Sequence, residues 1–288
     1  MMKKILKAAL PNSIVSFVQG SRYRGFRAQT GYLLKLRKYR TQYLKANATA
    51  PDSTVVLPAG CQIHVPDADV RFAFEFFGWR EPLMVDELVS FMNLTSNVKV
   101  LWDIGALFGV FSLAFTLEGT GRRAFAFEPN PASRAKLKEC VELNPTAQVK
   151  VFDFAVGLPG EVVEFESGFH YTAVSGMTSR PSEEKLIQKE TVSIDELINE
   201  NIEAPDVIKI DVEGHEFEVL HGARNLLFGK KPLLSLEMHP GALLRKGTSA
   251  LAIAEYLEEA GYVFHDMRNK RVGKDFFERE DIFRVFAV

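Results

Sequence analysis

From residue 97 onward, short apolar runs alternate with helix-like segments. The apolar runs occupy 98–102, 123–127, 149–152, 206–210, 232–236, 261–265 and 282–288, and the helix-like segments occupy 109–118, 131–143, 216–227 and 249–260. Strands that alternate with helices predict βαβ units and a mostly parallel sheet. We therefore expect an α/β fold for residues 95–288.

The first 94 residues have a different character. Strand-like runs at 54–57 and 62–65 are joined by Pro58-Ala59-Gly60, a turn signal that predicts a β-hairpin. A phenylalanine-rich run over 70–79 and a helix over 82–94 follow. We therefore divide the chain into an N-terminal extension, 1–94, and a main domain, 95–288.

Residues 1–45 contain eleven Lys or Arg and no Asp or Glu. A basic segment mixed with apolar residues is typical of peripheral contact with an anionic membrane, or of a solvated extension that packs on the acidic remainder of the chain. No nucleic-acid-binding motif accompanies it, so we expect no nucleic acid partner. The first 20 residues do not form a good signal peptide, and no stretch has the about 20 apolar residues of a membrane span. We expect a cytoplasmic protein, with attachment to a membrane surface as the alternative.

Two further features concern cysteines and one long irregular stretch. Cys61 and Cys140 are too few for a disulfide framework, which fits a reducing compartment. Residues 168–190 lack clear periodicity, and a loop of that length is often a lid or a binding loop. His170 and Tyr171 within it are candidate substrate contacts.

A glycine-containing turn joins the first strand of the main domain to its helix. A dinucleotide fingerprint has glycines at relative positions 0, 2 and 5, whereas this chain has Asp103 at position 0, Gly105 at position 2 and Gly109 at position 6. A carboxylate at position 0 would repel a pyrophosphate. S-adenosylmethionine, which carries a sulfonium and an ammonium and no phosphates, suits the turn better. A tight turn without a ligand is the alternative.

Glu128 ends the next strand, 25 residues after Asp103. An acid at about this distance from the glycine turn can accept hydrogen bonds from both ribose hydroxyls. The alternative is an ordinary acid at a helix entry, favoured by the helix dipole.

The chain resembles the FkbM-type S-adenosylmethionine-dependent methyltransferases from about residue 70 to 240. The resemblance rests on Trp79-Arg-Glu81-Pro82, Asp103-Ile-Gly105-Ala106-Leu-Phe-Gly109, Phe127-Glu128-Pro129-Asn130-Pro131, Asp206-Val-Ile-Lys209-Ile-Asp211-Val-Glu213-Gly214-His-Glu216 and Leu236-Glu237-Met-His239-Pro240. One position departs from the family pattern: Leu107 stands where asparagine is common.

The resemblance implies a Rossmann-like class I methyltransferase fold with a doubly wound, mostly parallel, seven-stranded sheet. It also implies methyl transfer to a hydroxyl, with sugars and polyketide-type natural products among known acceptors. By position, it implies that Asp103, Gly105 and Ala106 line the methionine end of the cofactor and that Glu128 holds the ribose. Asp153 and Phe154 would lie beside the adenine. Further cofactor residues implied by the motifs are Gly109, Asn130 and Glu81.

Acidic residues follow two later strands. If those strands are neighbours, Asp211, Glu213, Glu237 and His239 converge near the transferable methyl, where one of them would take the proton of the acceptor hydroxyl. Carboxylates at a sheet edge could also hold Mg²⁺ or Ca²⁺, although no residue is assigned as a metal ligand. Helix-dipole stabilisation is the alternative role for Glu213 and Glu216. A nicotinamide-dependent oxidoreductase and a non-catalytic binding module remain the alternatives to a methyltransferase.

Overall fold

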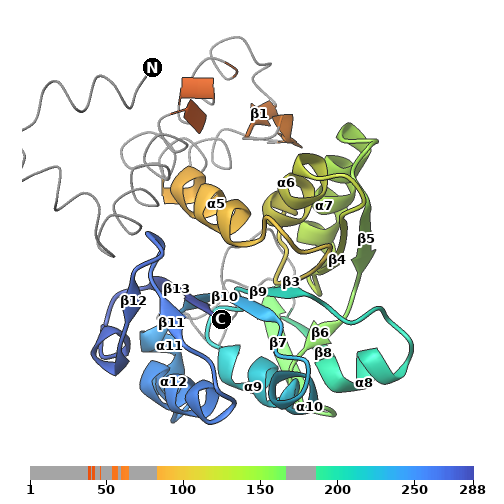
Figure 1. Ribbon diagram of the computed structural model, residues 1–288. Coiled ribbons are helices and arrows are strands. Elements are labelled where there is room, and N and C mark those ends of the chain that lie inside the picture. Colours follow the sequence, from red (N-terminus) through yellow and green to blue (C-terminus); the bar gives the residue numbers. More distant parts are fainter. Residues whose placement is uncertain are drawn as a thin grey trace, which may run out of the picture.

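The computed structural model describes residues 38–39, 41–42, 46, 54–57, 60–64, 83–166 and 186–288 (Figure 1). Several sequence predictions lie outside the described residues. They concern the basic segment up to residue 37, the phenylalanine-rich run, Glu81, His170 and Tyr171.

One eight-stranded sheet, in the order β12-β11-β13-β10-β9-β3-β4-β5, forms the centre of the described structure. Each of the seven predicted apolar runs overlaps one of its strands, and the two-residue β12 adds an eighth at the edge. Pairing is parallel from β10 through β9, β3 and β4 to β5, whereas β13 pairs antiparallel with both β10 and β11. The strands are β3 (Val100–Ile104), β4 (Arg123–Phe127), β5 (Val149–Phe152), β9 (Val207–Ile210), β10 (Leu233–Met238), β11 (Phe264–His265), β12 (Arg271–Val272) and β13 (Phe283–Ala287).

Helices cover both faces of this sheet (Figure 1). On one face lie α5 (Leu83–Leu94), α6 (Val110–Glu118) and α7 (Pro131–Leu143), and on the other lie α8 (Ile194–Asn199), α9 (Glu216–His221), α10 (Arg224–Phe228), α11 (Pro240–Arg245) and α12 (Ala250–Glu259). Strand β3 serves both layers because successive side chains point to opposite faces. Leu101 packs in the core with α5 and α6, and Trp102 packs in the core with α9, α10 and α12.

The strand order reverses between β3 and β9. Chain progression runs outward from β3 through β4 to β5 on one side, and from β9 through β10 on the other. In open α/β sheets, ligands bind at such a reversal, outside the carboxyl ends of the strands. The turn after β3 and the acidic segment after β9 both lie at this point.

The predicted hairpin is confirmed by β1 (Thr54–Val56) and β2 (Gln62–His64), which pair antiparallel. The Asn144 side chain holds it against the end of α7, because its Oδ1 accepts from Gln62 N at 3.0 Å and its Nδ2 donates to Gln62 O at 2.7 Å. Val55 and Ile63 enter the same core as α5 and α6. The boundary at residue 94 remains a prediction.

Two predictions of local structure need correction. Residues 186–190, expected at the end of a long loop, belong to β8 (Leu186–Val192), which forms a small sheet with β6 (Ala155–Val156) and β7 (Val162–Glu166). The single helix expected over 216–227 is two helices, α9 and α10. They divide at Gly222, where an added Cβ would lie 2.2 Å from the carbonyl oxygen of Gly157.

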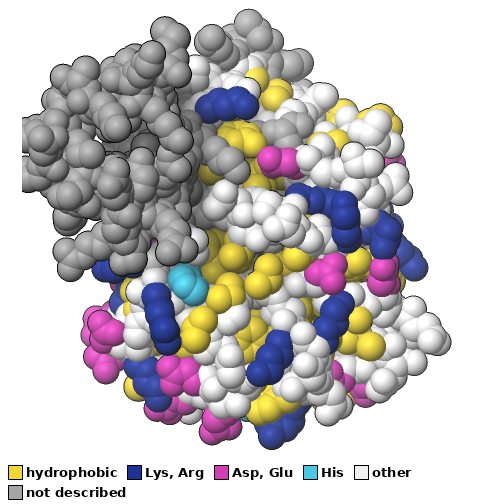
Figure 2. Space-filling view, in the orientation of Figure 1, with side chains coloured by type: hydrophobic (Ala, Val, Ile, Leu, Met, Phe, Trp, Pro, Cys, Tyr) yellow, Lys and Arg dark blue, Asp and Glu magenta, His cyan; other side chains and the backbone are white. Residues whose placement is uncertain are grey.

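The described surface carries mixed charge. Figure 2 shows Lys and Arg side chains interspersed with Asp and Glu over one face of the molecule. Within the described part of the chain, no helix is both long and apolar enough to cross a membrane.

Candidate active site

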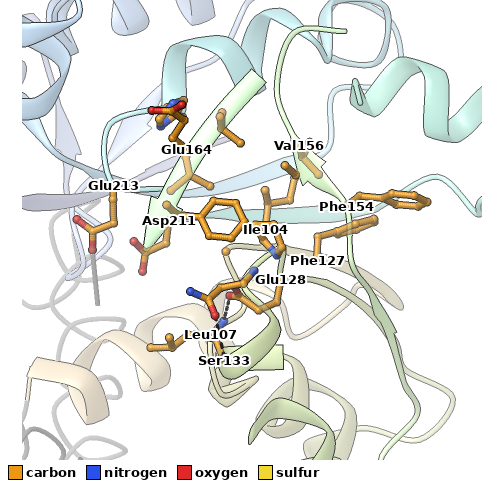
Figure 3. Close-up of a pocket in the computed structure, with 18 residues that line it drawn as sticks. Ile104, Leu107, Phe127, Glu128, Ser133, Phe154, Val156, Glu164, Asp211 and Glu213 are labelled. Carbon is orange, nitrogen blue, oxygen red and sulfur yellow. Dashed lines mark hydrogen bonds between the residues drawn. The ribbon is translucent and has the colours of Figure 1, made fainter. Parts of the chain in front are cut away.

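A cavity opens at the carboxyl ends of β3, β4 and β9, with an empty volume of about 910 Å³ that includes its open mouth (Figure 3). Predicted cofactor residues in its wall are Gly105, Glu128, Asn130 and Phe154, and predicted catalytic residues there are Asp211 and Glu213. The wall does not include Asp103, Ala106, Gly109, Asp153, Glu237 or His239.

Gly105 allows the turn after β3 to approach the turn after β9. Its φ is +79°, and an added Cβ would lie 1.8 Å from the carbonyl oxygen of Asp211. The amides of Gly105 and Ala106 both donate to the carbonyl of Phe127, at 3.0 and 3.1 Å. No other residue type fits at Gly105, because the obstacle is backbone and the conformation is left-handed.

Gly109 and Ala106 belong to the turn after β3 and lie next to α7. Gly109 has a φ of +76°, and an added Cβ would lie 2.3 Å from the Cδ1 of Leu137 on α7. Ala106 is buried in a small cluster with Ala126 and Leu137. Both residues therefore allow close packing of the turn on α7.

The Asp103 side chain is buried at the start of α6. Its Oδ2 accepts from the amide and the hydroxyl of Ser112, at 3.1 and 2.7 Å. Burial raises the pKa of Asp103, while Lys209 and the Ser112 donors oppose the rise. The carboxylate thus fixes the turn to α6, and its predicted contact with the methionine end of a cofactor remains untested.

The Glu128 carboxylate links the turn after β3 to the turn after β4 at the cavity floor (Figure 3). Its Oε2 accepts from Leu107 N at 2.8 Å, and its Oε1 accepts from Asn130 N at 3.0 Å. Burial raises the pKa of Glu128 to about 7, against the effect of these two donors. Each carboxylate oxygen can accept a further hydrogen bond, so Glu128 suits a ligand with paired hydroxyls.

Asp153 and Phe154 are adjacent but face different surroundings. Phe154 lines the cavity and stacks on Phe152, with ring centroids 5.7 Å apart. Asp153 is exposed and pairs with Lys189 at 3.0 Å, which lowers its pKa. Only Phe154 of the two is therefore placed to pack on a planar ring in the cavity.

Sequence reasoning missed one wall of the cavity. Strand β7 contributes Val163, Glu164 and Phe165, and β6 contributes Ala155 and Val156. The alternation Val163-Glu164-Phe165 is a strand signal, and it was the available clue. Further lining residues not predicted for the site are Ile104, Leu107, Phe127, Pro129, Ser133, Val212 and His215.

Asp211 lines the cavity and pairs with Lys209, a buried cation. Its Oδ2 is 3.1 Å from the Nζ of Lys209, which also lies 4.4 Å from the ring centroid of Phe111. Burial disfavours the charged form of Lys209, but the surrounding carboxylates, Asp211 first, raise its pKa overall. Lys209 is therefore charged and balances part of the acidic cluster.

Glu237 lies behind Asp211 and is tied to the last strand. Its Oε1 accepts from Arg284 Nη2 at 2.6 Å, and Arg284 Nε donates to Glu87 Oε2 at 2.6 Å. Burial raises the pKa of Glu237 to about 8, and Asp211 and Glu87 add to the rise. The pKa of Asp211 is instead lowered, because Lys209, His239 and a hydrogen bond with Glu237 outweigh its burial. The pKa values of the two carboxylates therefore move apart, and Glu237 is the more readily protonated of the two.

His239 lies between two glutamates. Its Nδ1 is 2.7 Å from Glu216 Oε1 and its Nε2 is 3.3 Å from Glu213 Oε2. Burial opposes the charged imidazole, but the contact with Glu216 and the charge of Glu213 raise its pKa to about 9. Burial also raises the pKa of Glu213 to about 7, while His239 opposes the rise. The four predicted catalytic residues thus lie together, two on the cavity wall and two behind it.

The predicted alternative of a divalent cation has one group of candidate ligands. Asp211, Glu237 and His239 offer one atom each within 4.8 Å of one another. Lys209 and Arg284 already pair with these two carboxylates. The described residues thus supply their own counter-charges, and a cation at this position is not supported.

A doubly wound sheet with a ligand cavity at its strand reversal defines the Rossmann-like class of α/β proteins. Within that class, the methyltransferase FkbM domain matches residues 103–264. The chain belongs to this family, as its motifs predicted.

One curated relative is the hexuronic acid methyltransferase AglP of Haloferax volcanii, 32% identical over 161 residues. The match covers 56% of this chain and 64% of the relative, so the chain spans just under two thirds of that protein.

Two solved structures are similar in fold. The methyltransferase FkbM of Methylobacillus flagellatus KT is 18% identical, with a TM-score of 0.43, and covers 76% of this chain and 59% of its own. The precorrin-6y C5,15-methyltransferase of Geobacter metallireducens GS-15 is 15% identical, with a TM-score of 0.41. The match covers 72% of this chain and 89% of that protein.

The cavity fits the methyl donor that the family implies. Glu128, at the end of β4, has acceptor oxygens that suit a ribose, and Phe154 offers a ring face that suits a base. Asp211 and Glu213 add carboxylates that suit a sulfonium and an ammonium. The donor set of the cavity therefore matches a cationic nucleoside.

Proposed function

We propose that this protein is an S-adenosylmethionine-dependent O-methyltransferase that acts on a hydroxyl of a sugar, with a hexuronic acid or related glycan as the acceptor class. The observation that carries the proposal is the distribution of acids along one cavity. Glu128, Phe154, Asp211 and Glu213 all line it, and Figure 3 shows Glu128 between Phe154 on one side and Asp211 and Glu213 on the other.

When bound, S-adenosylmethionine supplies an electrophilic methyl group. The residues of this chain would orient it: Glu128 would accept from the ribose hydroxyls, and Phe154 would pack on the adenine. Asp211 and Glu213 line the end of the cavity where an acceptor oxygen would lose its proton. Alignment and proton removal are what methyl transfer to an alcohol requires.

The acceptor class is supported by the relative and by charge. The relative is named as a hexuronic acid methyltransferase, and a hexuronic acid carries several hydroxyls. Two carboxylates at the reacting end disfavour an anionic acceptor atom and tolerate a neutral hydroxyl. A nicotinamide-dependent oxidoreductase is disfavoured by membership of a methyltransferase family.

Two measurements test this function. Calorimetric titration with S-adenosylhomocysteine should show a single site, and absence of binding to folded protein would overturn the proposal. A methyl-transfer screen over hydroxylated sugars, including methyl glucuronoside, should then show turnover that EDTA does not abolish. Binding without turnover of any acceptor would favour the non-catalytic module.

We also propose that residues 1–45 make peripheral contact with an anionic membrane. Their eleven basic and no acidic residues support this contact. Flotation with phosphatidylserine-containing vesicles should recover the full chain and lose most of it after deletion of 1–45. Equal recovery of both would contradict the proposal.

A further inference from the structure

Glu216 is a fully buried carboxylate at the start of α9, with 0% of its surface exposed. Its Oε1 accepts from Gly214 N at 3.0 Å and lies 2.7 Å from the Nδ1 of His239. Its Oε2 has no hydrogen-bond partner in the described part of the chain. Burying a carboxylate is costly unless it is paired, so its single side-chain contact, with His239, needs a reason.

His239 continues the contact toward the cavity. It follows β10 directly, and Pro240 begins α11 immediately after it, so its backbone is held by two regular elements. Nδ1 faces Glu216 and the opposite ring nitrogen, Nε2, faces Glu213 at 3.3 Å. A hydrogen bond at one ring nitrogen fixes the orientation of the ring and determines whether the other nitrogen carries a proton.

Glu213 is the member of this series that reaches the cavity. It lines the wall, and its side chain is 29% exposed. Its φ of 53° is in the left-handed region, which is uncommon for a residue other than glycine. The next residue, Gly214, also has a positive φ, and an added Cβ would lie 2.5 Å from the Cβ of Ala242. The segment is thus held in a strained conformation, and Figure 3 shows the Glu213 side chain at the edge of the site, next to that of Asp211.

We propose that Glu216 is a positioning residue for methyl transfer: it holds the His239 imidazole, which in turn holds Glu213 as the proton acceptor. This inference rests on the proposed function. In the step itself, the acceptor O–H bond breaks and its proton passes to the Glu213 carboxylate. The acceptor oxygen forms a bond to the methyl carbon, and the carbon–sulfur bond breaks with its electron pair left on sulfur.

The arrangement specifies which groups touch the acceptor. Only Glu213 of the three lies on the cavity wall, so it is the catalytic residue, and His239 and Glu216 act through it. The other acids on the wall have closer partners: Glu128 accepts from two backbone amides, Glu164 accepts from Gln188, and Asp211 is paired with Lys209. Glu213 has only the longer contact with His239, at 3.3 Å, and is therefore the carboxylate that we assign to the acceptor oxygen.

Glu216→Gln tests the inference because it keeps the shape of the side chain and removes its charge. Glu218→Gln is the matched control: Glu218 lies on the same helix, also has a buried oxygen without a partner, and pairs with Lys246 outside the series. Each variant and the wild type would be assayed for S-adenosylhomocysteine affinity and for kcat and KM with methyl glucuronoside. Imidazole ¹⁵N spectra would follow the protonation of both nitrogens of His239.

We expect Glu216→Gln to lower kcat by roughly 10- to 100-fold, part of the 10²- to 10⁴-fold that a positioned acid or base contributes, with S-adenosylhomocysteine affinity unchanged. The His239 ¹⁵N signals should shift in this variant and stay in place in Glu218→Gln. Glu216→Asp, which restores the charge, should recover part of kcat.

Equal kcat in Glu216→Gln and Glu218→Gln would overturn the positioning role, as would unchanged His239 signals in Glu216→Gln. A loss of S-adenosylhomocysteine affinity with kcat retained would also overturn it, by placing the effect in binding. Failure of the wild type to bind S-adenosylhomocysteine would instead overturn the proposed function.

Discussion

The backbone amide of Leu107 donates to the Oε2 of Glu128 at 2.8 Å while Leu107 itself has a φ of 49°. One hydrogen bond therefore holds a leucine in the left-handed conformation at the cavity floor. Asparagine tolerates this region better than leucine does, which gives a backbone reason for the asparagine that the resemblance led us to expect.

We expect Leu107→Asn to be more stable than Leu107→Ala by about 1 kcal/mol, since both lose the apolar contacts of leucine and only asparagine suits the left-handed region. Urea unfolding of the two variants at one pH measures the difference. Equal stabilities would show that the conformation at 107 carries no strain.

Glu128→Gln should weaken binding of S-adenosylhomocysteine by about tenfold or more, because hydrogen bonds to a charged group contribute about 1.5–3 kcal/mol. Calorimetric titration measures the loss. Glu139→Gln is the control and should bind as the wild type does, because Glu139 of α7 pairs with Lys136 and His64 and does not line the cavity. Unchanged affinity in Glu128→Gln would mean that the ribose lies elsewhere.

The raised pKa of Glu237, about 8 against an ordinary 4.5, predicts a dependence of stability on pH. The native state keeps a proton that the unfolded chain has lost between these values, so this group's contribution falls as pH rises from about 4.5 through 8. Glu237→Gln mimics the protonated form. Between pH 5.5 and 8.5, urea midpoints should therefore fall less in this variant than in the wild type, and parallel curves would contradict the assignment.

The product should be a methyl ether if the acceptor atom is a hydroxyl. Mild alkali hydrolyses a methyl ester and leaves a methyl ether intact, so the two products of a hexuronic acid acceptor can be told apart. We expect labelled methyl groups on methyl glucuronoside to survive alkali. Release of labelled methanol would show that the carboxylate is the acceptor and that no general base is needed.

Much of the architecture could be predicted because every strand of the main sheet except β12 coincides with a compact apolar run. Strand β9, for example, is buried at every position, and parallel strands covered on both faces have this pattern. Strand β8 escaped prediction because Gln188, Lys189 and Glu190 leave it no continuous apolar run. Its pairing with β7, and so one wall of the cavity, depends on contacts that no local pattern records.

The site was partly predictable for the same reason. Neighbouring parallel strands end at one edge, so the motifs after β3, β4, β9 and β10 had to meet. Which side chains reach the cavity was not predictable, since burial and hydrogen bonding decide it. Asp103 faces Ser112, Asp153 faces Lys189, and Glu216 contacts His239, 23 residues further on.

Arg284 of β13 bonds to Glu87 of α5, 197 residues earlier in the chain. Strand β13 also occupies the place between β10 and β11, so Glu87 and Glu237 gain their common cationic partner from a segment that follows both of them in the chain. A chain truncated before residue 283 would hold both acids without that partner. We expect the main sheet of such a truncated chain to be incompletely closed and sensitive to protease.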